Sequence, residues 1–160
     1  MIDWTDVDLD NCPVVGALDV IGDRWTMLIL REAMNGVTRF DDLVGHIGIG
    51  RSTLSDRIKK LVGAGILTER TYQETGSRPR HEYVLTDKGW GLRNVVVALK
   101  EWGDRHVLAA DERPLDLIDK STGSPVRLAL VDDDGNLVPD ERLRHAPGPG
   151  FRTLSEPASS

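Results

Sequence analysis

The stretch GRSTLSDRIKKLVGAGIL, from Gly50 to Leu67, decides the fold of this chain. Leu54, Ile58 and Leu61 follow helical spacing, and Val62 extends the same apolar stripe, so one side of a helix faces a core. The other side carries hydroxyl and basic side chains, not the Glu–Lys pairs typical of a solvated helix. Such groups near a helix start suit contact with a phosphate backbone and base edges. The stretch therefore predicts a helix that approaches nucleic acid.

The bulk composition favours a single domain with an appendage. The 160 residues are 39% hydrophobic, which is enough for a real core. The single cysteine, Cys12, excludes an intrachain disulfide framework and favours a reducing compartment. No apolar stretch approaches the length of a membrane span, and the acidic N-terminus lacks the pattern of a signal peptide. We therefore expect a cytoplasmic protein without membrane contact.

The charge is unevenly distributed along the chain. The net charge is −6, yet residues 36–90 carry nine basic against seven acidic residues. Residues 1–35 and 111–160 are both net acidic. The quoted helix thus lies in a net positive block, which is the distribution that a nucleic-acid interface requires.

The residues before the quoted helix predict three shorter helices. Pro13 can open the first of them, and Gly22 separates it from the second. RFDDLVGHI predicts the third helix, and GIG after it predicts a tight turn. The expected helices cover residues 13–21, 23–35 and 39–47, with the turn at 48–50. The third helix, the turn and the quoted helix together form a helix-turn-helix.

A hairpin and a long helix are expected after the helix-turn-helix. Residues 66–73 and 81–85 read as strands around a loop at 74–80, in the order of a winged helix. Arg78 and Arg80 would lie at the tip of this wing, where they can reach a phosphate or a narrow minor groove. Thr86 caps a helix expected from about Asp87 to Leu108. Its broad apolar stripe would pack on the domain and on a second copy.

The C-terminal part predicts short strands. PLDLI, VRLALV and NLVP have the composition of strands, and DDDGN predicts a hairpin turn. The final residues show no periodicity, which indicates a mobile tail. The expected fold class is mainly α with a small β-wing, a winged helix-turn-helix plus a short β-rich C-terminal extension. The expected parts are a DNA-binding and dimerisation domain over 1–110, the extension over 111–146 and the mobile tail over 147–160.

Four ordered motifs carry a family resemblance. They are CPVVGALDVIGDRWTMLILRE (12–32), RFDDLVGHIGIGRSTLSDRIKKLVGAGIL (39–67), RHEYVLTDKG (80–89) and WGDRH (102–106). The set resembles the HxlR family of bacterial winged-helix regulators, which are related to the MarR group. The resemblance implies a homodimer that binds a palindromic operator in double-stranded DNA and represses transcription. Two departures are a longer wing loop, ETGSRP, and a C-terminal extension without the cysteines of a zinc-ribbon-like hairpin, so neither a metal nor a cofactor is expected.

The candidate DNA-binding residues divide by role. Ser52, Ser55 and Lys59 are expected to face bases, and Arg51 to reach a guanine or a phosphate. Arg57 and Lys60 flank the apolar stripe and would contact the DNA backbone. Asp56 either accepts a hydrogen bond from a cytosine or pairs with one of these two basic residues, and we favour the pairing. The full candidate set is Arg39, Arg51, Ser52, Thr53, Ser55, Arg57, Lys59, Lys60, Arg78 and Arg80.

Two features of the sequence suggest inputs to regulation. Cys12 stands at a helix start, where a thiolate is stabilised, and some proteins of the resembled family use a cysteine here to sense oxidants or electrophiles. Nearby acidic residues and the lack of a second cysteine favour an inert thiol instead. A small-molecule effector would need a pocket, and large apolar side chains could form one or could form the dimer core. These side chains are Trp25, Leu28, Trp90, Leu99 and Trp102.

Other classes of function find less support. The four histidines, at 46, 81, 106 and 145, have no metal-ligand spacing with Cys12, and GIGRS lacks the lysine of a phosphate-binding loop. No enzyme activity is therefore expected. A winged helix that serves only protein interaction would lose its basic residues, whereas this chain keeps them in both the quoted helix and the wing. We therefore expect a repressor.

Overall fold

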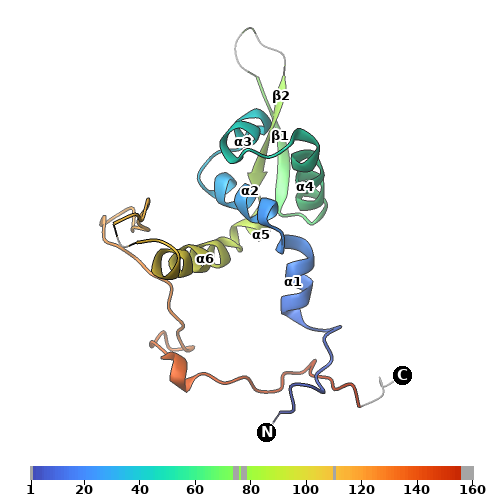
Figure 1. Ribbon diagram of the computed structural model, residues 1–160, viewed down its shortest axis with the longest axis vertical. Coiled ribbons are helices and arrows are strands. Elements are labelled where there is room, and N and C mark those ends of the chain that lie inside the picture. The colour runs from blue at the N-terminus through green and yellow to red at the C-terminus, as the bar shows by residue number, and fades with distance from the viewer. Residues whose placement is uncertain (1, 74–75, 77–78, 110, 156–160) are drawn as a thin grey trace.

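The computed structural model describes residues 2–73, 76, 79–109 and 111–155 (Figure 1). The order of its helices and strands up to residue 85 is the predicted one. The elements are α1 (Pro13–Ile21), α2 (Arg24–Met34), α3 (Phe40–Ile47), α4 (Arg51–Gly63), β1 (Leu67–Tyr72), β2 (Arg80–Leu85), α5 (Asp87–Trp90), α6 (Arg93–His106) and a 3₁₀ turn (Asp140–Arg142).

Local signals fix where the helices begin and end. α2 starts after Asp23, whose carboxylate accepts a hydrogen bond from the Thr26 amide at 3.1 Å. α3 ends at Gly48, where φ is +67°, in the left-handed region that favours glycine. The predicted glycine turn is therefore confirmed, and it directs the chain from α3 into α4.

The core lies where α2, α3 and α4 meet the base of the hairpin. Ile29 and Leu30 of α2 are fully buried at its centre. α4 contributes Leu54, Ile58 and Leu61 to the core as predicted, whereas Val62 is exposed. The other buried hydrophobic residues of this cluster are Ile21, Ala33, Leu43, Ile49, Ile66, Leu67 and Leu85.

The wing is a two-stranded antiparallel hairpin. Its register runs from Leu67 opposite Leu85 to Tyr72 opposite Arg80. The Tyr83 amide also donates to the Thr38 carbonyl at 2.8 Å, which ties β2 to the segment that leads into α3. Arg78, expected at the wing tip, lies outside the described residues, as does most of the loop. The hairpin stands beside α3 and α4, so both sides of the wing base are fixed to the helix-turn-helix (Figure 1).

The prediction of a single helix from Asp87 to Leu108 is wrong. The structure has the short α5 and the longer α6, separated at Gly91 and Leu92. Glycines at 89 and 91 weaken the helix at this point. Gly89 lies so close to the wing base that a Cβ there would be 2.3 Å from the Ile66 carbonyl oxygen. The break lets α5 pack against β2 while α6 leaves the domain.

The prediction of a β-rich C-terminal extension is also wrong. Within the described residues 111–155, β-pairing is limited to isolated bridges, among them Ile118 with Pro125 and Val131 with Leu137. The predicted turn is present, because the Asp132 amide donates to the Asn136 carbonyl at 3.0 Å. The apolar side chains of this segment are largely exposed. Strands without a shared buried face do not stabilise one another, so the segment stays irregular.

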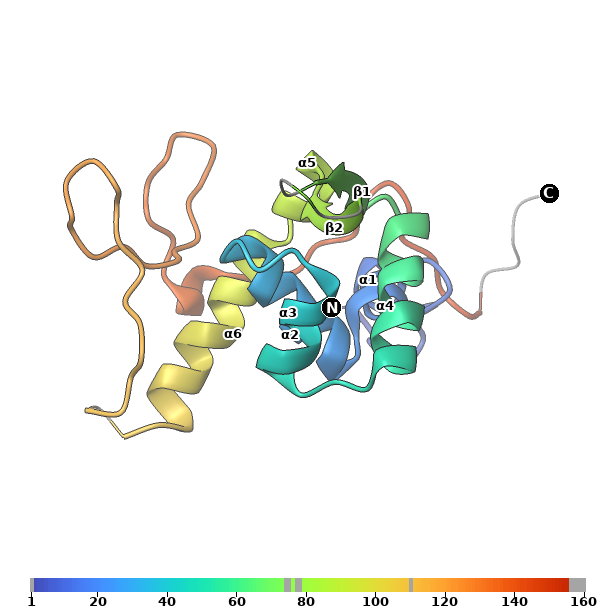
Figure 2. The ribbon, with the colours of Figure 1, turned by 90° about the horizontal axis from the view of Figure 1, so that it is seen from above.

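The C-terminal segment returns to the start of the chain. Val7 forms a bridge with Thr153, and the Leu154 amide donates to the Asp6 carbonyl at 2.7 Å. Ser155 donates twice to the Asp6 carboxylate, at 2.6 and 3.1 Å. α1 and α6 project from the domain, and the C-terminal segment connects their far ends (Figure 1). Seen from above, α6 extends away from α4 (Figure 2). We call the pairing of residues 6–8 with 152–155 the terminal clasp.

The described part of the chain is thus a mainly helical winged helix-turn-helix with a two-stranded wing. None of its helices combines the length and the apolar character that crossing a membrane requires.

Candidate nucleic-acid interface

α4 presents a polar side opposite its buried stripe. Ser52 and Lys59 are exposed on this side, and Ser55 is half-buried at its edge. The helix begins after Gly50, which has no side chain to cap the first amides. A phosphate can accept hydrogen bonds from such amides. The first turns of α4 therefore combine backbone donors, hydroxyls and a lysine.

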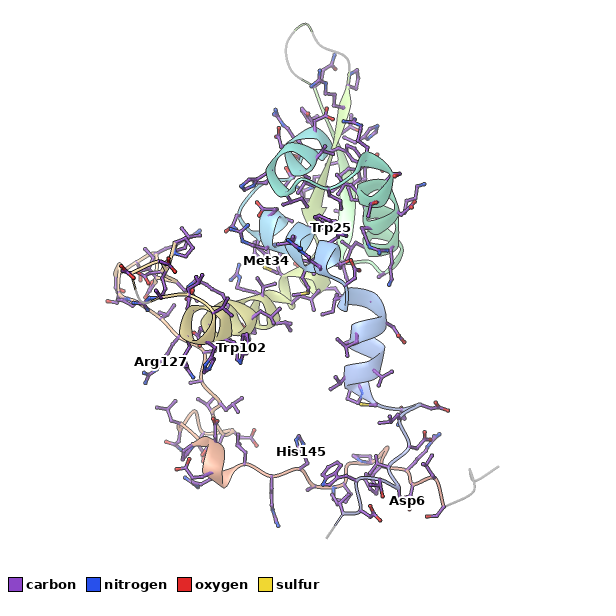
Figure 3. The ribbon with its side chains drawn as sticks, viewed as in Figure 1. Asp6, Trp25, Met34, Trp102, Arg127 and His145 are labelled. Carbon is purple, nitrogen blue, oxygen red and sulfur yellow. The ribbon has the colours of Figure 1, made fainter. Side chains whose placement is uncertain are left out.

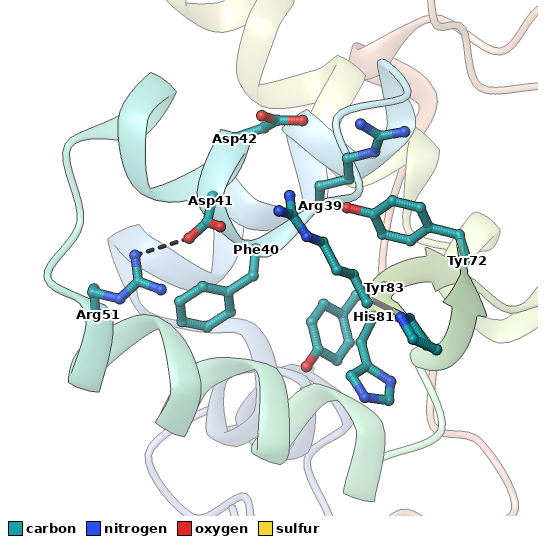
Figure 4. A pocket seen from close by; sticks show the side chains of 10 residues that line it. Arg39, Phe40, Asp41, Asp42, Arg51, Tyr72, His81 and Tyr83 are labelled. Carbon is teal, nitrogen blue, oxygen red and sulfur yellow. Dashed lines mark ion pairs between the residues drawn. The ribbon is translucent and has the colours of Figure 1, made fainter. Parts of the chain in front are cut away.

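Arg51 extends from the first turn of α4 toward α3. Its Nη1 lies 2.8 Å from Oδ1 of Asp41, and both side chains are 67% exposed (Figure 4). The guanidinium carbon lies 5.1 Å from the centre of the Phe40 ring, within cation–π distance. Arg51 is thus held between the two helices of the helix-turn-helix.

A groove of about 500 Å³ separates the start of α3 from the wing. Arg39 lies at one wall, with its guanidinium carbon 4.3 Å from the centre of the Tyr72 ring (Figure 4). Arg80 enters from β2, and Arg51 lines the same groove. Three arginines from three elements therefore surround one open groove, where an anionic strand would be attracted. The other lining residues are Phe40, Asp41, Asp42, Tyr72, Pro79, His81 and Tyr83.

A second groove, of about 420 Å³, lies between α4 and the wing. Ser55 and Lys59 line it together with Glu69 of β1 and Tyr83 of β2. Burial raises the pKa of the Tyr83 hydroxyl, and the nearby Glu69 carboxylate raises it further. Tyr83 therefore keeps its proton at neutral pH and can donate a hydrogen bond. The remaining lining residues are Phe40, Ile58, Val62 and Gly63.

Arg57 and Lys60 lie on a different side of α4. The Nε of Arg57 donates to Oδ1 of Asp23 at 3.0 Å, and Lys60 donates to the backbone carbonyl of Asp19. Both residues therefore connect α4 to the end of α1 and the start of α2. We expected Asp56 to pair with Arg57 or Lys60. In the structure Arg57 binds Asp23 and Lys60 binds the Asp19 carbonyl, so this prediction is wrong. Thr53 is four residues before Arg57 and shares its side of the helix.

The five residues proposed as an effector pocket or dimer core are not gathered at one place. Trp25 packs against the core of the domain and Leu28 is half-buried on α2. Trp90 is exposed at the end of α5, and Leu99 and Trp102 are exposed on α6. Figure 3 shows Trp25 in the domain and Trp102 far from it on α6. Neither groove described above is lined by any of the five.

Cys12 is the residue before the first turn of α1; its side chain is half-buried and makes no capping hydrogen bond. The preceding residue, Asn11, donates from its side chain to the Gly150 carbonyl at 3.0 Å, so the cysteine lies near the terminal clasp. Among the residues that the structure describes, no three His, Cys, Asp or Glu side chains gather where they could hold a metal ion.

The sequence did not point to the aromatic and acidic members of the interface. Tyr72 and Tyr83 come from the wing, and Phe40 and Asp41 from the start of α3. One available signal was the strand register, because pairing the two predicted strands brings Tyr72 opposite Arg80. The Arg51–Asp41 pair has no such signal, since it depends on the angle between α3 and α4.

Comparison with known proteins agrees with this architecture. Residues 20–111, more than half of the chain, match the HxlR-like helix-turn-helix family. The chain is 37% identical over 137 residues to the uncharacterized HTH-type transcriptional regulator Rv3095 of Mycobacterium tuberculosis, a match that covers 85% of each protein.

Solved structures are similar as well. PA1607, a protein proposed to be a transcription factor, is 38% identical, with a TM-score of 0.74 over 85% of this chain and 94% of that one. The redox regulator HypR in its oxidized form is 29% identical, with a TM-score of 0.55 over 61% of this chain and 100% of that one. The matched family consists of transcriptional regulators, not of enzymes. The chain belongs to the HxlR-like helix-turn-helix family and is an HTH-type transcriptional regulator.

Proposed function

We propose that the chain is a sequence-specific repressor that binds a palindromic operator in double-stranded DNA as a homodimer. The observation that carries this proposal is the position of the polar side of α4 beside two grooves that contain basic side chains. A helix of this kind fits the major groove, and the wing beside it can follow the backbone. The net charge of −6 does not oppose binding, because the basic residues are concentrated at this face.

The residues take different roles in this proposal. Ser52, Ser55 and Lys59 contact base edges from the polar side of α4. Arg39 and Arg80 contact phosphates on either side of the groove between α3 and the wing, and Arg78 adds a further contact at the wing. Arg57 and Lys60 bind residues at the start of α2 and the end of α1, so they hold α4 in place and do not contact DNA.

The exposed apolar sides of α1 and α6 support the homodimer. Leu18 on α1 is 57% exposed, and Leu99 and Trp102 on α6 are 55% and 60% exposed. Large apolar side chains left exposed on a helix mark an interaction surface. Burying them against a second copy would create a two-fold interface and place two copies of α4 on half-sites about 34 Å apart. A dimer on an operator in the cytoplasm would exclude RNA polymerase from the promoter.

The proposal is tested by fluorescence anisotropy with a labelled duplex taken from upstream of the protein's own gene. Salt is titrated, and a scrambled duplex of equal length serves as the reference. We expect tighter binding to the upstream duplex by about a thousandfold or more, a typical ratio for specific binding. Equal affinities for the two duplexes, with an equal dependence on salt, would contradict binding at this site.

Oxidant sensing through Cys12 is a second candidate. Its support is the similarity to HypR, which is a redox regulator, together with the half-buried position of the thiol at the start of α1. A change at this thiol would move α1 and with it the proposed dimer surface. We expect diamide to weaken operator binding by the wild-type protein and to leave a Cys12→Ser variant unaffected. Equal binding with and without diamide would leave the thiol without a sensing role.

A further inference from the structure

Asp41 is an acidic residue on the surface that the proposed function brings to DNA. It lines the groove between α3 and the wing, next to Arg39 and Arg51, and its side chain is 67% exposed. A carboxylate at this place repels phosphates, so it lowers affinity for any duplex. Such a residue opposes binding unless it performs another task at the interface.

The contacts of Arg51 indicate what that task is. Oδ1 of Asp41 forms an ion pair with Nη1 of Arg51 at 2.8 Å, and the Phe40 ring lies against the guanidinium (Figure 4). A guanidinium has five N–H donors in a planar fork, so a pair with one carboxylate oxygen leaves donors for a second partner. An arginine held on two sides also has fewer orientations than one that is free in solution.

We propose that Asp41 is a positioning residue that determines specificity. It holds Arg51 for a bidentate contact with a guanine and keeps it from neutralising a phosphate. The inference rests on the proposed DNA-binding function and goes beyond it, because it assigns an acidic residue of α3 to base recognition by α4. Arg51 then reads a base, and Arg39 and Arg80 supply the contacts with phosphates.

An Arg51 that contacts a guanine and an Arg51 that neutralises a phosphate give DNA binding a different dependence on salt. An arginine already paired with a carboxylate contributes little to counterion release when the protein binds non-specific DNA. The Asp41→Asn substitution frees Arg51, which can then neutralise a phosphate in any sequence. Non-specific binding should therefore tighten, and its logarithmic salt slope should become steeper by about 0.9. The substitution leaves folding unchanged, because a pair this exposed contributes little to stability.

The experiment selects binding sites from a randomised double-stranded library with the wild-type protein and with Asp41→Asn. Affinities for the selected duplex and for a scrambled one are then measured across a salt series. We expect the wild type to select a guanine at one position of each half-site. Asp41→Asn should lose that preference, and its ratio of specific to non-specific affinity should fall by about fivefold or more, the discrimination that one bidentate contact provides.

Two controls isolate the role of the pair. Asp42→Asn removes the same charge one residue further along α3, and Asp42 has no ion pair in the described part of the chain. In an Arg51→Ala background, Asp41→Asn should change the affinity ratio no further.

Three outcomes would overturn the inference. The first is an unchanged guanine preference in Asp41→Asn. The second is an equal fall of the ratio in Asp42→Asn, because the effect would then be one of charge alone. The third is a wild-type protein that selects no sequence, which would remove the proposed function as well, whereas the first two leave sequence-specific binding intact.

Discussion

Asp23 shows how a single carboxylate can connect two helices. It accepts hydrogen bonds from the Thr26 amide and hydroxyl at the start of α2, and from Arg57 of α4. Partial burial by itself would raise the pKa of Asp23, but the bonds from Thr26 and Arg57 outweigh it and hold the pKa below the ordinary value of 3.8. The charged form is therefore the one that the folded protein favours.

This shift predicts a dependence of stability on pH. A carboxyl whose pKa is lower in the folded state stabilises the protein above its unfolded pKa, and the contribution is lost as pH falls through the folded pKa. We expect Asp23→Asn to be less stable than the wild type at pH 6, with the difference shrinking below about pH 4. Asn keeps one oxygen to cap the Thr26 amide, and the dependence of the difference on pH isolates the charge. Urea unfolding between pH 6 and pH 3 measures it, and a constant difference across this range would contradict the assignment.

Glu32 is a carboxylate inside the domain and leads to a second prediction. Its side chain is 1% exposed, and it pairs with Arg31 and with Nδ1 of His46, the latter at 2.8 Å. Removing His46 leaves a buried acceptor with one partner fewer, which costs about 1–3 kcal/mol. We expect His46→Ala to lower the free energy of unfolding by this amount in urea titrations. In a Glu32→Met background the same substitution should cost almost nothing, and an equal cost in both backgrounds would show that His46 acts independently of Glu32.

Single residues were predictable where their role depends only on helical period. Ser52 and Lys59 are exposed opposite the buried stripe, as the spacing requires. Arg57 was assigned to DNA because its partner could not be seen in the sequence, since Asp23 lies 34 positions away. Periodicity says which residues leave the core, but it does not say which of them meets another helix.

Elements were predictable where a local signal marks their ends. Capping groups, glycine turns and the change from helical to alternating pattern located α1 to α4 and the wing. The break between α5 and α6 was missed because the close approach of Gly89 to the Ile66 carbonyl is a tertiary contact. The prediction of C-terminal strands was wrong for a related reason, since short apolar runs become strands only when a sheet buries them.

The two sides of α4 predict different roles for two adjacent lysines, Lys59 in DNA binding and Lys60 in stability. Lys59 lines the groove between α4 and the wing, whereas Lys60 donates to the Asp19 carbonyl at the end of α1. We expect Lys59→Ala to reduce the logarithmic salt slope of DNA binding by about 0.9, and Lys60→Ala to leave the slope unchanged. Lys60→Ala should lower the unfolding midpoint in urea instead. The two variants are matched in chemistry, so similar salt slopes would refute this division of the helix.

At the scale of the whole molecule, the chain forms an open frame. The domain lies at one end of this frame, α1 and α6 form two sides of the frame, and the C-terminal segment connects the far ends of the two helices (Figure 1). The segment is also attached to α6, because the Leu128 amide donates to the Glu101 carboxylate at 2.8 Å. The terminal clasp therefore limits how far α1 can move relative to α6. In the proposed dimer, that distance would set the separation of the two copies of α4.

The terminal clasp predicts that a residue far from α4 affects operator binding. Asp6→Ala removes both hydrogen bonds from Ser155, at 3.1 and 2.6 Å, while the core of the domain is untouched. Exposed hydrogen bonds are individually weak, so we expect the dimer dissociation constant to rise by roughly threefold to tenfold. Sedimentation velocity across a dilution series measures it, and Asp3→Ala is the matched control because the Asp3 carboxylate accepts only from Thr5 among the described hydrogen bonds. Operator affinity should fall in Asp6→Ala, whereas affinity for a single half-site should not. A dimer constant equal to that of Asp3→Ala would mean that the clasp orders the chain ends without holding the proposed dimer surface together.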